Sequence, residues 1–272
     1  MVAIQLLLSA CLDPTGNIRR GSSAALQELI GRHPDQVSNG IALVQVVDYH
    51  AVGLRRRAMV DVAQHAADLD SMYREALLNA LGNWRGLGST DIVSREAAAE
   101  SSGLLCAPQT PQQVKATLEH LQKCIFSFPS SDLEQCHGSL LALSQIVDTK
   151  VRQSIGDDSS SLDDRNLSYL ISLWDLFSQD TSLYKNQTSR ALRAELPFSV
   201  ARLVASLGEL SLLLGTAHLE VRLHRLTLSQ IVSGLISSSE ASVLVVLPRL
   251  VRVLSRLHTL GHTDNPILLF SD

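Results

Sequence analysis

The chain has 272 residues, of which 45% are hydrophobic and only 4% aromatic, and its formal net charge is −4. Leucine, alanine and serine dominate without alternating β-branched runs, which favours helices packed through aliphatic stripes. The acidic balance argues against a nucleic-acid-binding surface, and no apolar run approaches the roughly 18 to 20 residues that a membrane span needs.

The cysteines and the N-terminal residues point to a cytosolic helical protein. Four cysteines share no close spacing, and each lies in or beside an apolar helical segment: Cys11, Cys106, Cys124 and Cys136. We therefore expect reduced, buried thiols. Residues 2–8 lack the basic region and cleavage site of a signal peptide. No polar cap precedes them, which suggests a helix within a longer array of repeats.

The first two predicted helices cover residues 2–12 and 17–32 and form a hairpin. The turn between them is Asp13-Pro14-Thr15-Gly16, and Asn17 is the expected N-cap of the second helix. Several small or apolar residues then fall on one face at helical spacing, which is the expected packing face. They are Ile18, Ser22, Ala25, Leu26 and Leu29.

An acid in the turn and an arginine early in the next helix commonly bond neighbouring repeats in HEAT-type hairpins. Asp13 and Arg19 have that spacing, and Asp91 and Arg95 loosely repeat it. Ala24, Ala25 and Gly31 are small enough to let helices pack closely. Most of the helix 17–32 is therefore interpreted as structural.

The remaining pattern predicts further helices joined by short turns, with a repeat of about 40 residues. The expected helices are 37–48, 54–66, 71–84, 91–105, 111–127, 131–154, 163–178, 181–215 (broken or kinked at Pro197), 217–236 and 240–258. Residues 262–272 are expected to form a loop. The predicted fold is all-α, a HEAT/armadillo-like α-solenoid of stacked antiparallel helical hairpins.

The predicted organisation has two helical regions and one loop. Residues 1–154 form HEAT-like repeats, residues 155–164 an acidic, serine-rich polar loop, and residues 165–272 further HEAT-like repeats.

Motifs for catalysis or cofactor binding are absent from the sequence. Gly86-Leu87-Gly88 follows a helix and lacks the Lys-Ser/Thr of a phosphate loop, so an inter-helix turn is expected. His120 and Cys124 share a helix face, but two ligands do not close a zinc site. Ser139 has no nucleophile-elbow pattern around it. We predict that the chain is not an enzyme and has no cofactor or metal.

The densest basic run, Arg55-Arg56-Arg57, has two interpretations. It is either a solvated helix start or, with nearby arginines, a contact patch for an acidic protein surface, to which arginine offers planar, paired donors. The candidate partner-binding residues are Arg19, Arg20, Tyr49, Arg55, Arg56 and Arg57. Arg249, Arg252 and Arg256 are expected to form an exposed stripe.

Two segments carry a resemblance to a known family. The first is Arg19-Arg20-x-x-Ser23-Ala24-Ala25-x-Gln27-Glu28-x-x-Gly31-Arg32, followed by Gly40-Ile41, and the second is Asp48-Tyr49-x-Ala51-Val52-Gly53-x-Arg55. Together they resemble the tubulin-folding cofactor D family of tubulin-specific chaperones. The likeness covers about residues 12–147.

The resemblance implies a large HEAT-repeat chaperone of the cytoplasm and the microtubule cytoskeleton. Such a chaperone binds β-tubulin and acts with cofactor E and an Arf-like small GTPase in αβ-tubulin assembly. With cofactor C it stimulates GTP hydrolysis by tubulin, so the nucleotide belongs to the partners. Two alternatives remain: a HEAT scaffold or transport adaptor for another protein, and a helical hydrolase, which would need a pocket with perturbed titratable groups.

Overall fold

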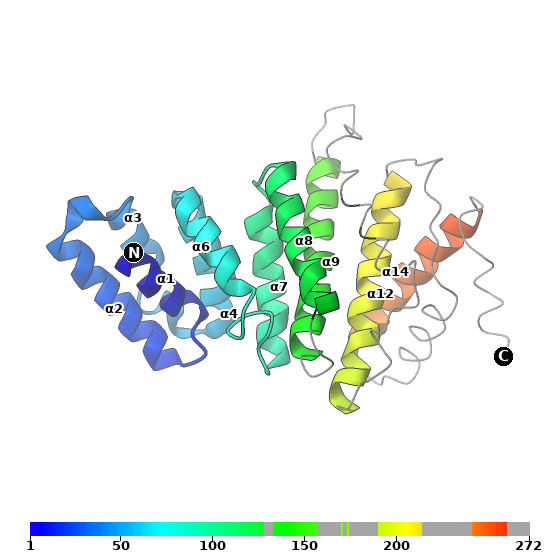
Figure 1. Cartoon of the computed structure of the whole chain (residues 1–272), viewed down its shortest axis with the longest axis horizontal. Coiled ribbons are helices and arrows are strands. Elements are labelled where there is room, and N and C mark those ends of the chain that lie inside the picture. The colour runs from blue at the N-terminus through cyan, green and yellow to red at the C-terminus, as the bar shows by residue number, and fades with distance from the viewer. Residues whose placement is uncertain (128–132, 157–169, 171–172, 174–189, 214–240, 260–272) are drawn as a thin grey trace. The chain divides into compact units, whose positions relative to one another are not determined.

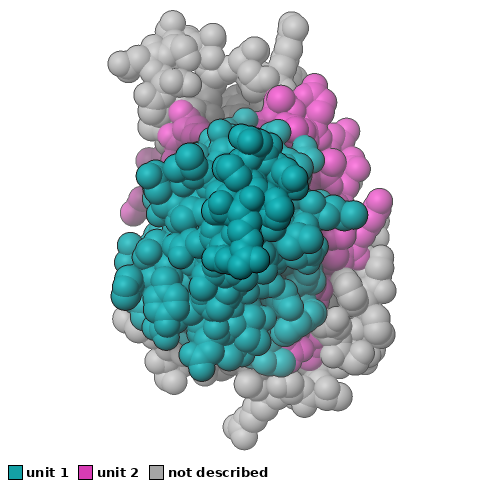
Figure 2. Space-filling model, turned by 90° about the vertical axis from the view of Figure 1, so that its left-hand side faces the viewer, with its two compact units in different colours: residues 1–108 teal, residues 109–272 magenta. Residues whose placement is uncertain are grey.

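A computed structural model of the chain shows an all-α fold (Figure 1). It describes residues 1–127, 133–156, 170, 173, 190–213 and 241–259. None of these residues belongs to a strand. The chain divides into two compact units, residues 1–108 and 109–272 (Figure 2). The division falls between the helices predicted at 91–105 and 111–127. The boundary predicted at 155–164 lies almost wholly outside the described residues and stays a prediction.

Unit 1 is a stack of helical hairpins, as the sequence predicts. Its elements are α1 (Val2–Leu12), α2 (Gly16–Arg32), η1 (Pro34–Gln36), α3 (Gly40–Val46), η2 (Ala51–Gly53), α4 (Arg55–Arg57), the π-helical turn η3 (Ala58–Val62), α5 (Ala63–Leu69), α6 (Ser71–Leu81) and α7 (Ile92–Cys106). α4, η3 and α5 follow one another without a break. The hairpins are therefore α1 with α2, α3 with the segment from α4 to α5, and α6 with α7.

The second helices of these hairpins recur at the repeat length of HEAT-type proteins. Their N-caps are Thr15, Leu54 and Asp91, which lie 39 and 37 residues apart. The N-terminal ends of α2, α4 and α7 lie on the same side of unit 1, at the bottom of Figure 1. The three turns that precede these helices therefore meet along one side of the unit.

Unit 2 contains α8 (Pro111–Ser127), α9 (Leu133–Gly156), α12 (Arg190–Leu213) and α14 (Ala241–Thr259) among its described residues. α9 packs against α8 and α12, and α12 packs against α14. Apolar residues such as Leu140, Leu203 and Leu250 are buried between them. Unit 2 therefore continues the pattern of a helical stack, with each helix covered by its neighbours.

The packing face of α2 differs from the prediction. The helix begins at Gly16 with Thr15 as N-cap, so Asn17 is not the cap. The buried residues of α2 are Arg19, Ser22, Ser23, Leu26 and Ile30, whereas Ile18 is 49% exposed and Ala25 is also exposed. The face is rotated because α2 packs on the following hairpin as well as on α1. Ser23, for example, donates to the carbonyl of Val47 at 2.6 Å.

Several helix limits also differ from the prediction. The helix predicted at 37–48 begins only at Gly40, because Asn39 adopts a left-handed conformation with φ of 50°. The helix predicted at 71–84 ends at Leu81, so Trp84 lies in the next turn. α12 begins at Arg190 and continues through Pro197 without a break. The helices predicted at 163–178 and 217–236 and the tail 262–272 lie outside the described residues, apart from Leu170 and Leu173.

The four cysteines are free and buried, which confirms that part of the prediction. Burial raises the pKa of the Cys11 thiol to about 12, because a thiolate is disfavoured away from water. Within the part of the chain that the structure describes, no helix has the length and apolar character needed to cross a bilayer.

Candidate protein-binding surface

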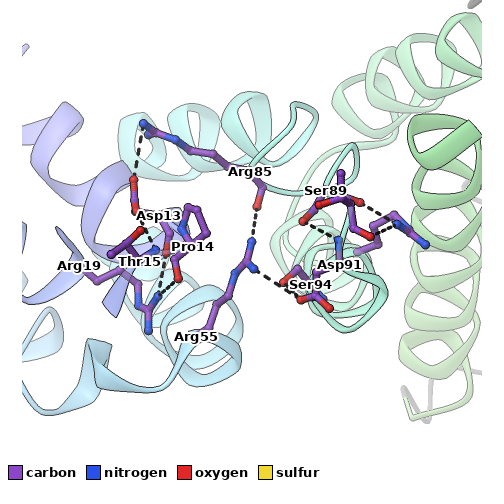
Figure 3. A network of polar contacts seen from close by, with 11 residues as sticks. Asp13, Pro14, Thr15, Arg19, Arg55, Arg85, Ser89, Asp91 and Ser94 are labelled. Atoms are coloured by element: carbon purple, nitrogen blue, oxygen red, sulfur yellow. Dashed lines mark hydrogen bonds and ion pairs between the residues drawn. The ribbon is translucent and has the colours of Figure 1, made fainter. Parts of the chain in front are cut away.

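Three turns of unit 1 are joined by arginine side chains into one surface, which we call the turn edge and define as residues 13–20, 48–57 and 83–95 (Figure 3). Arg19 connects the first turn to the second, and Arg55 connects the second to the third. Every contact described below lies within unit 1 unless stated otherwise. The turn edge contains all six residues that the sequence singles out for partner binding.

Arg19 is the most buried of the predicted partner-binding residues, with 3% exposure. Its Nε donates to the carbonyl of Val52 at 2.8 Å and its Nη2 to that of Gly53 at 2.7 Å. Its Nη1 donates to the carbonyls of Asp13 and Pro14 at 2.8 and 3.0 Å. The guanidinium therefore satisfies main-chain acceptors of two adjacent hairpins and is not offered to a partner.

Arg95 repeats this geometry in the third hairpin. It is 2% exposed, and its Nη1 donates to the carbonyls of Ser89 and Thr90 at 2.7 and 3.2 Å. Ser89 and Thr90 lie six and five residues before Arg95, just as Asp13 and Pro14 lie six and five residues before Arg19. The counterpart of Asp13 is thus Ser89. Asp91, which the sequence pattern pairs with Arg95 as Asp13 is paired with Arg19, instead matches the N-cap Thr15.

The carboxylate of Asp13 does not accept from Arg19, in contrast to the expected acid–arginine pair. It accepts from the backbone N–H of Thr15 at 2.9 Å and lies 3.7 Å from Nη2 of Arg85. Only the backbone carbonyl of Asp13 accepts from Arg19. The turn directs the Asp13 side chain toward the N–H of Thr15, which leaves the Asp13 carbonyl facing the guanidinium.

Arg55 is half-buried and joins the second turn to the third. Its Nη2 donates to the carbonyl of Arg85 at 3.5 Å, and its Nη1 lies 3.5 Å from the carboxylate of Asp91. Asp91 caps α7 by accepting from the backbone N–H of Ser94 at 3.1 Å and from its hydroxyl. The hydrogen bond from the Ser94 hydroxyl is the main reason that the pKa of Asp91 is lowered, although burial opposes the shift.

The other predicted partner-binding residues are more exposed. The guanidinium of Arg20 lies over the ring of Tyr49, 5.6 Å from its centroid, and Tyr49 is 46% exposed. Arg56 forms an ion pair with Glu100 at 2.5 Å. Arg57 is exposed and has no hydrogen bond or ion pair to any residue that the structure describes. These side chains are accessible to a partner, and Arg20 and Arg57 lack a counter-charge.

The structure adds apolar residues that sequence reasoning did not select. Leu54, Trp84 and Val93 belong to the turn edge and are 70%, 62% and 56% exposed. The guanidinium of Arg85 lies over the ring of Trp84, 5.1 Å from its centroid. One sequence signal could have indicated this site: Trp84 and Arg85 stand beside a glycine-rich turn. Large side chains in a turn are exposed to solvent.

The Gly86-Leu87-Gly88 segment is an inter-helix turn, as predicted. Leu87 donates its N–H to the carbonyl of Leu81 at 2.8 Å, and Gly88 donates to Asn83 at 3.0 Å. A Cβ on Gly86 would lie only 2.2 Å from the Leu81 carbonyl oxygen. Glycine is therefore required here by close backbone packing, and the turn supports the third part of the turn edge.

In unit 2, two sequence features have structural explanations. His120 Nε2 lies 3.8 Å from the sulfur of Cys124, but the described residues contain no group of three or more His, Cys, Asp or Glu side chains able to hold a metal. Ser139 is buried and lies 3.4 Å from the amide nitrogen of Gln135.

The predicted exposed stripe on α14 is only partly correct. Arg252 and Arg256 are exposed, but Arg249 bonds both Asp148 of α9 and Glu209 of α12, with shortest distances of 2.7 and 2.6 Å. Burial disfavours the charge of Arg249, yet its hydrogen bonds to Glu209 and Asp148 outweigh this effect and raise its pKa. Arg249 therefore joins three helices instead of lying free on the surface.

Comparison with known proteins supports the resemblance seen in the sequence. The chain is 27% identical over 143 residues to the tubulin-specific chaperone D of Dictyostelium discoideum. The match includes 52% of this chain and 9% of that protein, so this chain spans a small part of its relative's length. No family model matches the chain, and no solved structure matches it. The likeness indicates a distant relation to a tubulin chaperone.

Proposed function

We propose that this chain is a segment of a tubulin-folding chaperone that binds β-tubulin through non-covalent contacts. The observation that carries the proposal is the 27% identity to a tubulin-specific chaperone over 143 residues. The fold supports it, because a stack of helical hairpins presents the long, repetitive surfaces that solenoid proteins use for binding. The protein would act in the cytoplasm and at the microtubule cytoskeleton.

The wider assembly follows from the family resemblance. In the proposed assembly, the chain acts with cofactor E and an Arf-like small GTPase while αβ-tubulin is put together. With cofactor C, the chain stimulates GTP hydrolysis by tubulin. In this proposal the chain contributes binding surfaces and holds no nucleotide, cofactor or metal itself. Its contribution to GTP hydrolysis would come from positioning its partners.

A second candidate is a HEAT scaffold or transport adaptor for a different protein. The observation that keeps this alternative open is that the relative is matched over only 9% of its length, and hairpin stacks of this kind serve many partners. Capture of tubulin together with the GTPase favours the chaperone. Capture of basic localisation peptides without tubulin favours the adaptor.

Site-specific photocrosslinking during co-purification tests the proposal. Lysine-directed reagents cannot map unit 1, because residues 1–108 contain nine arginines and no lysine. A photoreactive phenylalanine analogue at Val93 places the probe on the turn edge, and the same analogue at the exposed residue Ile41 of α3 serves as control. We expect β-tubulin to co-purify with the tagged chain and to crosslink at position 93. Absence of tubulin from both preparations would refute the proposed function.

A further inference from the structure

The exposed and half-buried side chains of the turn edge include a set that we call the arginine–apolar strip and define as Arg20, Tyr49, Leu54, Arg57, Trp84, Arg85 and Val93. Arg20 lies over Tyr49. Its Nη2 also lies beside Gly53, 3.1 Å from the point where a Cβ would stand if residue 53 had a side chain. Leu54 follows Gly53 directly. Arg55 then reaches the carbonyl of Arg85, whose own guanidinium covers Trp84. These contacts link the second turn, through Arg55, to Arg85 and Trp84 in the third turn.

The strip carries an excess of positive charge in a chain whose net charge is −4. The turn edge contains seven arginines (Arg19, Arg20, Arg55, Arg56, Arg57, Arg85 and Arg95) and three carboxylates (Asp13, Asp48 and Asp91), with Glu100 beside it. Burial and the nearby charges of Arg55 and Arg20 lower the pKa of Arg19, more than the attraction of Asp13 compensates. The excess of arginines over carboxylates makes the local field positive, and this field favours an acidic partner.

The residue types in the strip are those that contribute most to protein–protein binding. Tryptophan, tyrosine and arginine are enriched among binding hot spots. Stacking on Tyr49 and Trp84 holds the guanidinium groups of Arg20 and Arg85 in place, so less side-chain entropy is lost when a partner binds. Arginine also forms paired hydrogen bonds with carboxylates, which lysine cannot do.

We propose that the arginine–apolar strip binds an acidic segment of a partner protein in which apolar side chains alternate with carboxylates. This inference rests on the proposed function in one respect, since it names the surface through which the chaperone would hold its client. A nucleic acid fits the strip less well. It would leave Leu54 and Val93 without apolar partners.

Binding measurements on the full chain test the strip with three probes: αβ-tubulin, a fluorescent synthetic peptide of glutamates interspersed with leucines, and oligothymidine. The strip variants are Leu54→Ser, Trp84→Ala and Arg57→Glu. The matched controls are Ile41→Ser, whose side chain is 72% exposed in the wild type, and Arg252→Glu on α14. Leu54→Ser should leave the fold intact, because serine is a better N-cap than leucine. Far-UV circular dichroism checks each variant.

We expect each strip variant to weaken binding of the acidic peptide about tenfold or more, as hot-spot substitutions do, and both controls to bind like the wild type. If the peptide follows this pattern but tubulin does not bind the wild-type chain, the strip stands and the proposed chaperone function fails. If tubulin binds and the strip variants retain full affinity for both tubulin and peptide, the strip is refuted and the chaperone function stands. Tighter binding of oligothymidine than of the acidic peptide also overturns the inference.

Discussion

Arg19 of α2 donates to the main-chain carbonyl of Gly53 in the next hairpin at 2.7 Å. This bond and the companion bond to Val52 hold two consecutive repeats together through a buried cation. Because α2 and the turn at 51–53 belong to different hairpins, their register depends on this side chain. The same relationship explains why an arginine so early in a helix is buried.

Replacing Arg19 with alanine should destabilise the chain by about 2–4 kcal/mol, because buried carbonyls lose a charged donor and remain without a partner. Urea unfolding followed by far-UV circular dichroism measures the change. Arg57→Ala is the control, since Arg57 is exposed, and it should alter stability by less than about 0.5 kcal/mol. Equal midpoints for the two variants would show that Arg19 does not join the hairpins.

Gly86→Ala should destabilise the chain by about 1–3 kcal/mol, because the new methyl group would overlap the backbone of Leu81, which has no room to shift. The matched substitution is Gly21→Ala in α2, where no atom lies within 4 Å of the new Cβ. That change should stabilise the chain by about 0.5–1 kcal/mol, as expected for glycine to alanine inside a helix. Thermal melts of the two variants should therefore shift in opposite directions.

Arg249→Ala should cost about 2–4 kcal/mol, because it leaves the buried carboxylate of Asp148 without its partner. A double-mutant cycle with Asp148→Ala isolates the pair, and we expect a coupling energy of about 1 kcal/mol or more. Arg252→Ala, on the same helix, should have little effect. Additive single substitutions would contradict the ion pair that the structure shows.

Asp91→Ala should cost about 1 kcal/mol at neutral pH, the usual value for losing an N-cap. The pKa of Asp91 is lowered in the folded chain. Its charge therefore contributes stability that is fully present above the unfolded pKa of about 4 and is lost as the pH falls through the lower, folded pKa. Asp91→Asn keeps the cap acceptor and removes the titration. The stability difference between wild type and Asp91→Asn should accordingly shrink on acidification, and a constant difference from pH 7 to pH 3 would contradict the assignment.

Local signals in the sequence are sufficient to predict the all-α repeat architecture and most helix positions. Apolar spacing of 3.6 residues and the proline and glycine turns are local signals, and α1, α7, α8 and α14 match the predicted ranges within one residue at each end. The buried state of the four cysteines also followed from local context, because each lies in or beside an apolar helical segment.

The contacts of individual polar residues depend on how the hairpins stack and could not be predicted from the sequence. Periodicity places Ile18 and Arg19 one residue apart on α2, but the next hairpin determines that Arg19 is buried and Ile18 exposed. Asp13 lies near Arg85, 72 residues away, and Arg249 lies near Asp148, 101 residues away. Such partners cannot be read from local spacing, because the stacking of hairpins brings them together. The sequence pattern also extends a helix over residues 71–84, but the helix ends at Leu81, and Trp84 lies in the turn beside Arg85, where it forms part of the arginine–apolar strip.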